Sequence, residues 1–271
     1  MTTINPYGLR FDGIDDYCTF NSISFPLFDG NNDFTIEACV YTNSYPRNQE
    51  PLSAHTFLHL ENSFFVQLGD KAPVNEISCR AIFNKSKWVT ILRSGPINLK
   101  QWYFISITYD SNSGYTMYLN GEKVDEYFTT ENILTQNILN YIGSSINNER
   151  FWDGAAKEIR IWNTCRTQQE IQENMNKKLT GNETGLIAYY PMTEGEGNIL
   201  YDYSGNANHG TIHGATWIDI NNKWNWNSDS YLIKDGNNTL TFDLINQEWI
   251  VLDHNQENFK NKGITSLDNL I

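Results

Sequence analysis

Residues 101–121, QWYFISITYDSNSGYTMYLNG, decide the fold that the sequence predicts. Within 102–109 every second residue is Tyr or Ile, and the alternation resumes after the polar stretch 110–114. Period-two alternation bounded by Asp, Asn, Ser and Gly predicts two antiparallel strands joined by a turn. The following Asn120-Gly121 pair is typical of a type I′ turn, in which both central residues take positive φ. The stretch therefore predicts three consecutive strands of a larger sheet, because an isolated hairpin is marginally stable in water.

Strand-like runs continue on both sides of this meander, separated by Gly-, Asn- and Asp-rich turns. The predicted strands are a pair around a turn in 7–20, then 34–41, 63–68, 76–83, 88–93, 122–128, 137–142 and 151–162, and a further pair within 186–217. Residues 34–41 carry apolar side chains on both faces, which predicts a central strand. Many short strands with regular turns predict an all-β, two-sheet antiparallel jelly-roll sandwich.

A single short helix is predicted late in the chain. Thr167 and Glu170 form the capping-box pattern, and an apolar stripe follows at Ile171, Met175 and Leu179 before Gly181. The helix is amphipathic, so we expect it to cover a core.

Three segments are predicted. Residues 1–218 form the sandwich, and residues 219–230, DINNKWNWNSDS, lose all periodicity and are interpreted as a linker. Residues 231–271 hold short strand-like runs and are predicted to be a small β-rich connector or the start of a further module, because about 40 residues rarely support an independent core.

Composition narrows the classes of partner. With 19 basic and 32 acidic residues the formal charge is −13, which argues against binding nucleic acid or an anionic membrane surface. No apolar run is long enough for a membrane helix, so we expect no membrane insertion, and no signal peptide is predicted in this chain. The four cysteines lack metal-site spacing and are predicted to be free thiols, with a Cys18–Cys39 disulfide between neighbouring strands as the alternative.

Catalysis is not predicted. Glycoside hydrolysis requires two carboxylates that face one cleft, and the sequence has no strand with the spacing Glu-x-Asp-x-x-Glu, nor any nucleophile or phosphate-loop motif. Binding a neutral glycan requires exposed aromatic faces and polar partners instead. Trp152, Trp88, Tyr45 and Arg93 lie in or near predicted loops and are the candidate ligand-binding residues, whereas Trp102 and Trp162 are predicted to be structural.

Five motifs in order resemble the laminin-G-like, concanavalin-A-like jelly-roll domains over residues 7–217. These motifs are Leu9-Arg-Phe-Asp-Gly13 with Asp16-Tyr17, Phe34-Thr-Ile-Glu37, Trp102 with Thr108-Tyr-Asp110, Tyr118-Leu-Asn-Gly121, and Glu158-Ile-Arg-Ile-Trp-Asn163 with Arg166-Thr167-Gln168. The Gly-rich stretch 185–210 is similar to one that often precedes the first motif in this family. Here it follows the helix, and we expect it to close the same sandwich in permuted order.

The resemblance also implies a calcium site. Laminin-G-like domains often hold Ca²⁺ beside carboxylate-bearing turns, which places Asp12 and Asp153 as candidate metal ligands in this chain. Hard cations prefer six to eight oxygen ligands, and both aspartates stand next to glycine. Lys157 stands where the family commonly has an aspartate, and ordinary turn chemistry is the alternative role for both residues.

The sequence yields three functional hypotheses. The first is a non-catalytic carbohydrate-recognition module that binds a host cell-surface polysaccharide, carried by a phage tail, a tail-like particle or a bacterial surface protein. This location follows from residues 231–271, which resemble short modules of phage and prophage structural proteins. The second hypothesis is a structural module of a virion or adhesin that forms a homo-oligomer or larger assembly and binds no glycan. The third is a glycan-active enzyme.

Overall fold

The computed structural model describes residues 7–21, 32–46, 54–61, 63–69, 73–83, 88–129, 131, 133, 139–145 and 149–220, and the backbone of 232–235, 238–243 and 248–252. The chain separates into two compact units, 1–224 and 225–271, whose boundary falls within the predicted linker.

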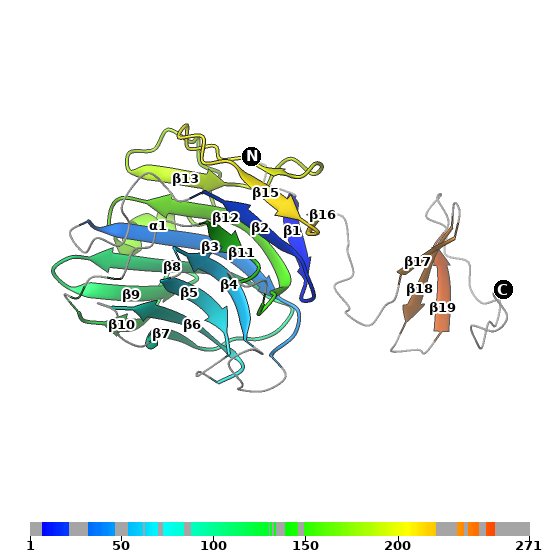
Figure 1. Ribbon diagram of the computed structural model, residues 1–271, viewed down its shortest axis with the longest axis horizontal. Coiled ribbons are helices and arrows are strands. Elements are labelled where there is room, and N and C mark those ends of the chain that lie inside the picture. Colours follow the sequence, from blue (N-terminus) through cyan, green and yellow to red (C-terminus); the bar gives the residue numbers. More distant parts are fainter. Residues whose placement is uncertain are drawn as a thin grey trace. The chain divides into compact units, whose positions relative to one another are not determined.

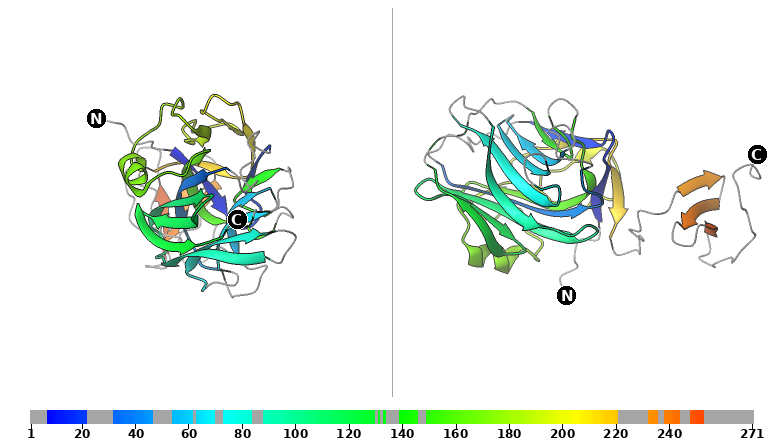
Figure 2. Two further views of the ribbon diagram at one scale, coloured as in Figure 1. Left: turned by 90° about the vertical axis from the view of Figure 1, so that its left-hand side faces the viewer. Right: turned by 90° about the horizontal axis from the view of Figure 1, so that it is seen from below.

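The first unit is a sandwich of two eight-stranded antiparallel sheets, visible as two layers in Figure 2. Sheet A has the order β10-β9-β8-β3-β12-β1-β16, with β13 also paired to β12. Its strands are β1 (Tyr7–Asp12), β3 (Phe34–Thr42), β8 (Trp102–Asp110), β9 (Gly114–Leu119), β10 (Glu122–Tyr127), β12 (Asp153–Trp162), β13 (Leu186–Tyr190) and β16 (Thr216–Asp219). The all-β jelly-roll prediction is therefore confirmed.

Sheet B has the order β14-β15-β2-β11-β4-β5-β6-β7 (Figure 1). Its strands are β2 (Tyr17–Phe20), β4 (His55–Leu60), β5 (Phe64–Leu68), β6 (Glu76–Ile82), β7 (Trp88–Pro96), β11 (Asn140–Ile142), β14 (Ile199–Leu200) and β15 (Gly210–His213). The turn after β1 carries the chain from sheet A to sheet B, so the predicted strand pair within 7–20 is divided between the sheets.

The predicted meander is present as β8, β9 and β10. Asn120 and Gly121 have φ values of 52° and 81°, as a type I′ turn requires. Tyr103, Ile105, Ile107 and Tyr109 point into the core between the sheets. Strand β3 lies between β8 and β12 and is buried on both faces, which confirms its predicted central position.

The late Gly-rich stretch closes the sandwich on both sheets. Strand β13 pairs with the second half of β12, and β16 pairs with β1 in sheet A. Strands β14 and β15 extend sheet B beyond β2. These pairings fit the predicted permuted order of strands.

The predicted helix is α1 (Gln168–Asn174), with Thr167 as its N-cap. Thr167 Oγ1 accepts a hydrogen bond from the backbone N–H of Glu170, and the Glu170 side chain accepts one from the Thr167 N–H, which confirms the capping box. The helix is shorter than predicted. The Arg160 guanidinium donates hydrogen bonds to the carbonyls of Asn174 and Lys177, at and beyond the end of the helix. Leu179 packs against Trp162 from the non-helical segment that follows.

Helix α1 and the turn after it cover the outer face of sheet A (Figure 2). Beneath them Arg160 is fully buried, with its guanidinium 2.9 Å from Glu158 and 3.8 Å from Glu37. Trp162 Nε1 and Tyr189 Oη donate hydrogen bonds to the carboxylates of Glu37 and Glu158, respectively. Burial raises the pKa of Glu37, and the neighbouring arginines oppose that rise. The predicted structural role of Trp162 agrees with this position.

The second unit contains a three-stranded antiparallel sheet of β17 (Leu232–Asp235), β18 (Asn238–Asp243) and β19 (Glu248–Leu252). The short strand-like runs predicted within 231–271 are thus present as strands. All four cysteines are free, with Cys18 in sheet B and Cys39 in sheet A. Within the described residues, no helix has the length and apolar content needed to cross a membrane.

Candidate functional site

The structure places Trp152 in the core, which corrects its prediction as a ligand-binding residue. Its side chain is 1% exposed, packs edge-on against Phe57 and donates from Nε1 to the Tyr41 carbonyl at 3.2 Å. A tryptophan without an exposed face has no surface on which a sugar ring can stack. The polar residues around it in the sequence suggested a loop, but the chain enters β12 of sheet A at this point and the Trp152 side chain lies in the core between the two sheets.

The other three predicted contact residues do not form one cluster. Tyr45 packs against the core and donates from its hydroxyl to the Ile97 carbonyl at 2.7 Å. Arg93 lies on β7, 3.9 Å from Glu76, and its side chain is 45% exposed. Trp88 begins the same strand and is half-buried, with its ring 4.5 Å from that of Phe65. Only Trp88 belongs to a larger group of aromatic side chains.

That group is a row across the outer face of sheet B, to which seven neighbouring strands each contribute one side chain. We call it the aromatic row, and its members in strand order are His213, Tyr17, Tyr141, His59, Phe65, Arg80 and Trp88. Four of the neighbouring pairs are direct register partners: His213 with Tyr17, Tyr141 with His59, His59 with Phe65, and Phe65 with Arg80. The antiparallel register therefore aligns residues that lie far apart in the chain.

The middle of the aromatic row is buried. The His59 ring lies 4.0 Å from that of Phe65 and 6.1 Å from that of Tyr141. The Arg80 guanidinium lies 5.8 Å from the Trp88 ring. Aromatic and cation–π contacts of this kind hold the rings in fixed orientations.

The end of the row on β15, β2 and β11 is accessible. Its members Tyr17, Tyr141 and His213, together with the adjacent outward residue Thr19, are here called the open end. All four side chains are half-buried. The rings of Tyr17 and His213 stack at 4.5 Å, and those of Tyr17 and Tyr141 lie 6.3 Å apart. Thr19 Oγ1 lies 3.1 Å from His213 Nε2, within hydrogen-bond distance. The open end thus combines aromatic faces with a hydroxyl and an imidazole.

The predicted metal ligands lie at one end of the sandwich. Asp12 and Asp153 are register partners on β1 and β12. Both Asp153 oxygens accept hydrogen bonds from the Asn43 amide, and one also accepts the hydroxyl of Ser44. Because both carboxylate oxygens of Asp153 already accept hydrogen bonds from neighbouring side chains, Asp153 is less suited to hold a metal than Asp12.

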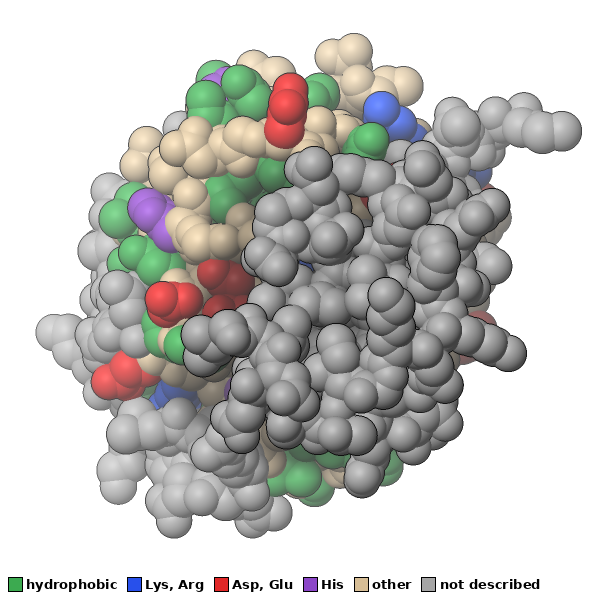
Figure 3. All heavy atoms as spheres, turned by 90° about the vertical axis from the view of Figure 1, so that its right-hand side faces the viewer, with side chains coloured by type: hydrophobic (Ala, Val, Ile, Leu, Met, Phe, Trp, Pro, Cys, Tyr) green, Lys and Arg blue, Asp and Glu red, His purple; other side chains and the backbone are tan. Residues whose placement is uncertain are grey.

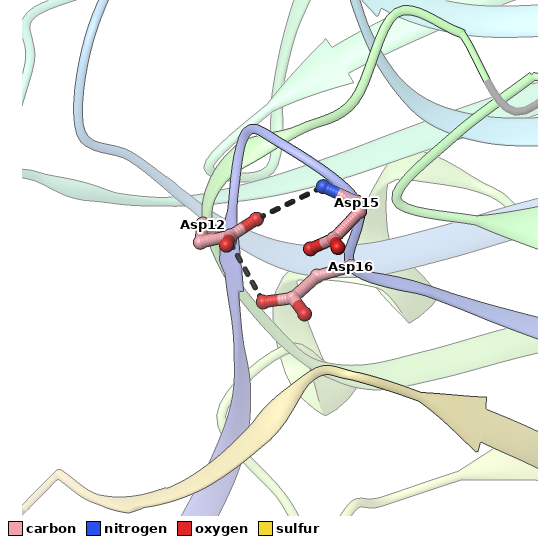
Figure 4. Close-up of side chains that lie close together, drawn as sticks. All are labelled: Asp12, Asp15 and Asp16. Atoms are coloured by element: carbon pink, nitrogen blue, oxygen red, sulfur yellow. Dashed lines mark hydrogen bonds between the residues drawn. The ribbon is translucent and has the colours of Figure 1, made fainter.

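Asp12 belongs instead to a cluster with Asp15 and Asp16, whose ligand atoms all lie within 4.8 Å of one another (Figure 4). Asp12 Oδ1 accepts the backbone N–H groups of Ile14 and Asp15, and Asp16 Oδ2 accepts that of Asp12. Burial, followed by repulsion from Asp12, raises the pKa of Asp16 to about 6. Figure 3 shows a small group of acidic side chains on one face of the described residues.

This cluster fits the calcium that the family resemblance implies, because its donors are carboxylate oxygens and a cation would relieve their repulsion. Asp12, Asp15 and Asp16 are the residues that would hold the ion. The sequence identified Asp12 as a candidate ligand, and the structure places Asp15 and Asp16 beside it.

Sequence reasoning missed the open end altogether. Tyr17, Tyr141 and His213 come from three strands, and only register and strand order bring them together. The available signal was that each stands at an outward position of its strand. That signal becomes useful only once the strand order is known.

Several solved structures are similar to this chain. A candidate carbohydrate-binding protein from Bacteroides ovatus ATCC 8483 superposes with a TM-score of 0.64 at 21% identity, over 80% of this chain and 61% of that protein. This chain thus spans about three fifths of that protein's length, and the likeness concerns the fold alone. A heptameric SAP-like pentraxin from Limulus polyphemus has a TM-score of 0.45 and 14% identity, over 64% of this chain and 82% of that one. The binding domain of botulinum neurotoxin serotype G has a TM-score of 0.45 and 17% identity, over 57% and 39%.

A search of curated proteins gave no match. The model of one family, described as the concanavalin A-like lectin/glucanases superfamily, matches residues 12–172, which is more than half of the chain. The match begins at the end of β1 and extends into α1, so it covers strands of both sheets. The chain belongs to the concanavalin A-like lectin/glucanase superfamily.

Proposed function

We propose that this protein is a non-catalytic carbohydrate-recognition module and that the open end of the aromatic row is its binding surface. The observation that carries the proposal is the stacked Tyr17–His213 pair beside Tyr141, on the accessible part of sheet B. Membership of a superfamily of lectins and glucanases supports it, as does the shared fold of the Bacteroides ovatus protein.

The chemistry of the open end suits a sugar ring. The apolar C–H face of a pyranose packs on an aromatic ring, and its hydroxyl groups need hydrogen-bond partners at the edge of that ring. Tyr17 and Tyr141 would supply the rings, and Thr19 and His213 would supply hydrogen-bonding groups. The rings are held by their neighbours, so binding would cost little conformational entropy.

Binding without catalysis is the simplest use of this arrangement. The buried carboxylates Glu37 and Glu158 are committed to Arg160 and to the support of α1. Asp202 is committed to backbone N–H groups in the loop after β14. These groups have structural partners, whereas glycoside hydrolysis requires a carboxylate pair that faces substrate.

For the ligand we propose a host cell-surface polysaccharide, recognised by a phage tail, a tail-like particle or a bacterial surface protein. We also propose that Ca²⁺ binds at the Asp12–Asp16 turn and stabilises the adjoining end of the sandwich. Neither proposal is required for the other, because the turn and the open end use different side chains.

The test is binding of the whole chain to a glycan array and to soluble cell-wall polysaccharide from Gram-positive bacteria. We expect Tyr17→Ala and Tyr141→Ala each to weaken binding by about three- to tenfold, the value of one aromatic contact. Phe128→Ala is the matched control, because Phe128 is an aromatic residue 73% exposed just after β10 in sheet A. Wild-type binding that survives both open-end substitutions would refute the proposed surface. A constitutive oligomer without any glycan signal would favour the structural module.

A further inference from the structure

The loop after β14 presents a second aromatic surface at the edge of sheet B. Leu200 and Asp202 point inward and are buried, whereas Ile199 and Tyr201 alternate with them and are 43% and 41% exposed. Exposed apolar side chains that lie next to one another, unlike single ones, can mark an interaction site.

Asp202 fixes this loop. Its Oδ1 accepts the backbone N–H groups of Tyr189 and Ser204, each at 2.9 Å. Its Oδ2 accepts the Ser204 hydroxyl and the Asn208 N–H at the same distance. Four hydrogen bonds to one buried carboxylate hold the loop that follows Tyr201 against β13, which gives the Tyr201 ring a defined position.

Tyr201 packs against His209. Their rings are 5.5 Å apart at 71°, an edge-to-face contact. The N–H of Asp202 donates to His209 Nδ1 at 3.0 Å, so the neutral imidazole carries its proton on Nε2. The pair therefore offers an aromatic face and a hydrogen-bond donor, the same chemistry as the open end.

This pair is continuous with the open end along β15. His213 and Thr211 point outward from β15, and His209 stands two residues before Thr211. Ile199 is the register partner of Thr211, and Thr211 is the partner of Thr19 in the open end. At about 3.3 Å per residue, His209 and His213 are about 13 Å apart, which exceeds one sugar ring.

We propose that Tyr201 and His209 form a second glycan contact and that the ligand is an extended polysaccharide segment lying along β15 across both contacts. This inference rests on the proposed function. It specifies the ligand class as an internal stretch of a linear chain, because a single terminal sugar reaches only one contact. Affinity then rises with chain length until both contacts are occupied.

The experiment titrates the whole chain with size-graded fragments released by mild acid from Gram-positive cell-wall polysaccharide. We expect wild-type affinity to rise with fragment length. Tyr201→Ala should remove that rise, lowering the affinity for long fragments by about three- to tenfold while leaving the shortest bound fragment unchanged. Tyr201→Phe keeps the ring and should retain the rise, and Phe128→Ala should behave as wild type.

The outcomes separate this inference from the proposed function. If Tyr17→Ala weakens all fragments while Tyr201→Ala leaves long fragments unaffected, the second contact is overturned and the open end stands. If no fragment binds the wild type, both are overturned. Tyr201 is exposed, and thermal unfolding of its variants should match the wild type, so a loss of affinity reports the contact itself.

Discussion

On the outer face of sheet A, Arg160 is fully buried between two carboxylates and beneath α1, whereas on the outer face of sheet B the side chains of Tyr17, Tyr141 and His213 reach solvent. Both faces carry polar and aromatic residues on strands of similar pattern. They differ in what covers them. The chain leaves β12, turns, and returns as α1 over sheet A, where carbonyls of Asn174 and Lys177 complete the contacts of Arg160.

The comparison teaches that residue type alone does not identify a binding surface. A charged or aromatic side chain contributes to stability when its partners lie within the fold, and it is available to a ligand when part of its surface faces solvent. Sheet A illustrates the first case and the open end of sheet B the second. Substitutions on sheet A should therefore change stability, and substitutions at the open end should change binding.

The largest effect is expected from Arg160→Met. Removing the guanidinium leaves Glu158 buried without its cation, leaves Glu37 with Arg166 at 3.8 Å, and also frees the two carbonyls after α1. Breaking a buried pair in this way costs about 3–5 kcal/mol. Urea denaturation should show this loss, with Lys123→Ala as the control because its pair with Glu126 is exposed to solvent and contributes little to stability. A loss as small as that of the control would contradict the interpretation that the buried charges under α1 stabilise sheet A.

A smaller effect is expected between the two sheets, at Trp152. Trp152→Phe keeps an aromatic ring but loses the hydrogen bond from Nε1 to the Tyr41 carbonyl and puts a smaller side chain in a buried position. The expected cost is about 2 kcal/mol of unfolding free energy. Glycan affinity, measured well below the unfolding temperature, should be unchanged. Weaker glycan binding at unchanged stability would show that Trp152 contacts the ligand after all.

Local pattern predicted most of the sandwich. The alternation in 102–109, the Asn120-Gly121 turn and the capping box at Thr167 each specify their structure through neighbours in the sequence. Helix length was overestimated, because Arg160, outside the helix, determines where it ends. The division of 7–20 between two sheets also escaped prediction, since a turn sequence does not say which sheet receives the next strand.

The candidate site was predicted far less well than the fold. Trp152 was chosen for its polar surroundings in the sequence, yet its burial depends on Phe57 from another strand. Tyr17 and His213 stack although 196 positions separate them along the numbered chain. Only Trp88 among the predicted contact residues lies in the aromatic row. Register between distant strands is a long-range property, and no local pattern specifies it.

The smallest effect is expected at the Asp12–Asp16 turn, whose carboxylates are neither paired with a cation as on sheet A nor part of an aromatic surface as on sheet B. Asp16 has a pKa of about 6 in the folded protein against an ordinary value of 3.8. Its protonated form therefore favours folding: this contribution is complete below about pH 3.8 and is lost as the pH rises through about 6. Asp16→Asn should remove this dependence and stabilise the protein by about 0.5–1 kcal/mol at pH 7.5, a value reduced for solvent screening.

The effect of Asp16→Asn on stability should depend on calcium. A bound cation favours the ionised carboxylates, so with CaCl₂ the wild type should gain stability at pH 7.5 and Asp16→Asn should gain less, because a ligand that binds only the native state stabilises it. The measurement is the denaturation midpoint of both proteins at pH 5 and 7.5, with CaCl₂ or with EGTA. Asp153→Asn is the control, since Asn43 and Ser44 already occupy that carboxylate. Equal midpoints with CaCl₂ and EGTA in the wild type would show that the acidic turn binds no calcium. The turn would then affect stability only through its uncompensated charge, in contrast to the paired charges on sheet A, and it would bind no ligand, in contrast to the open end.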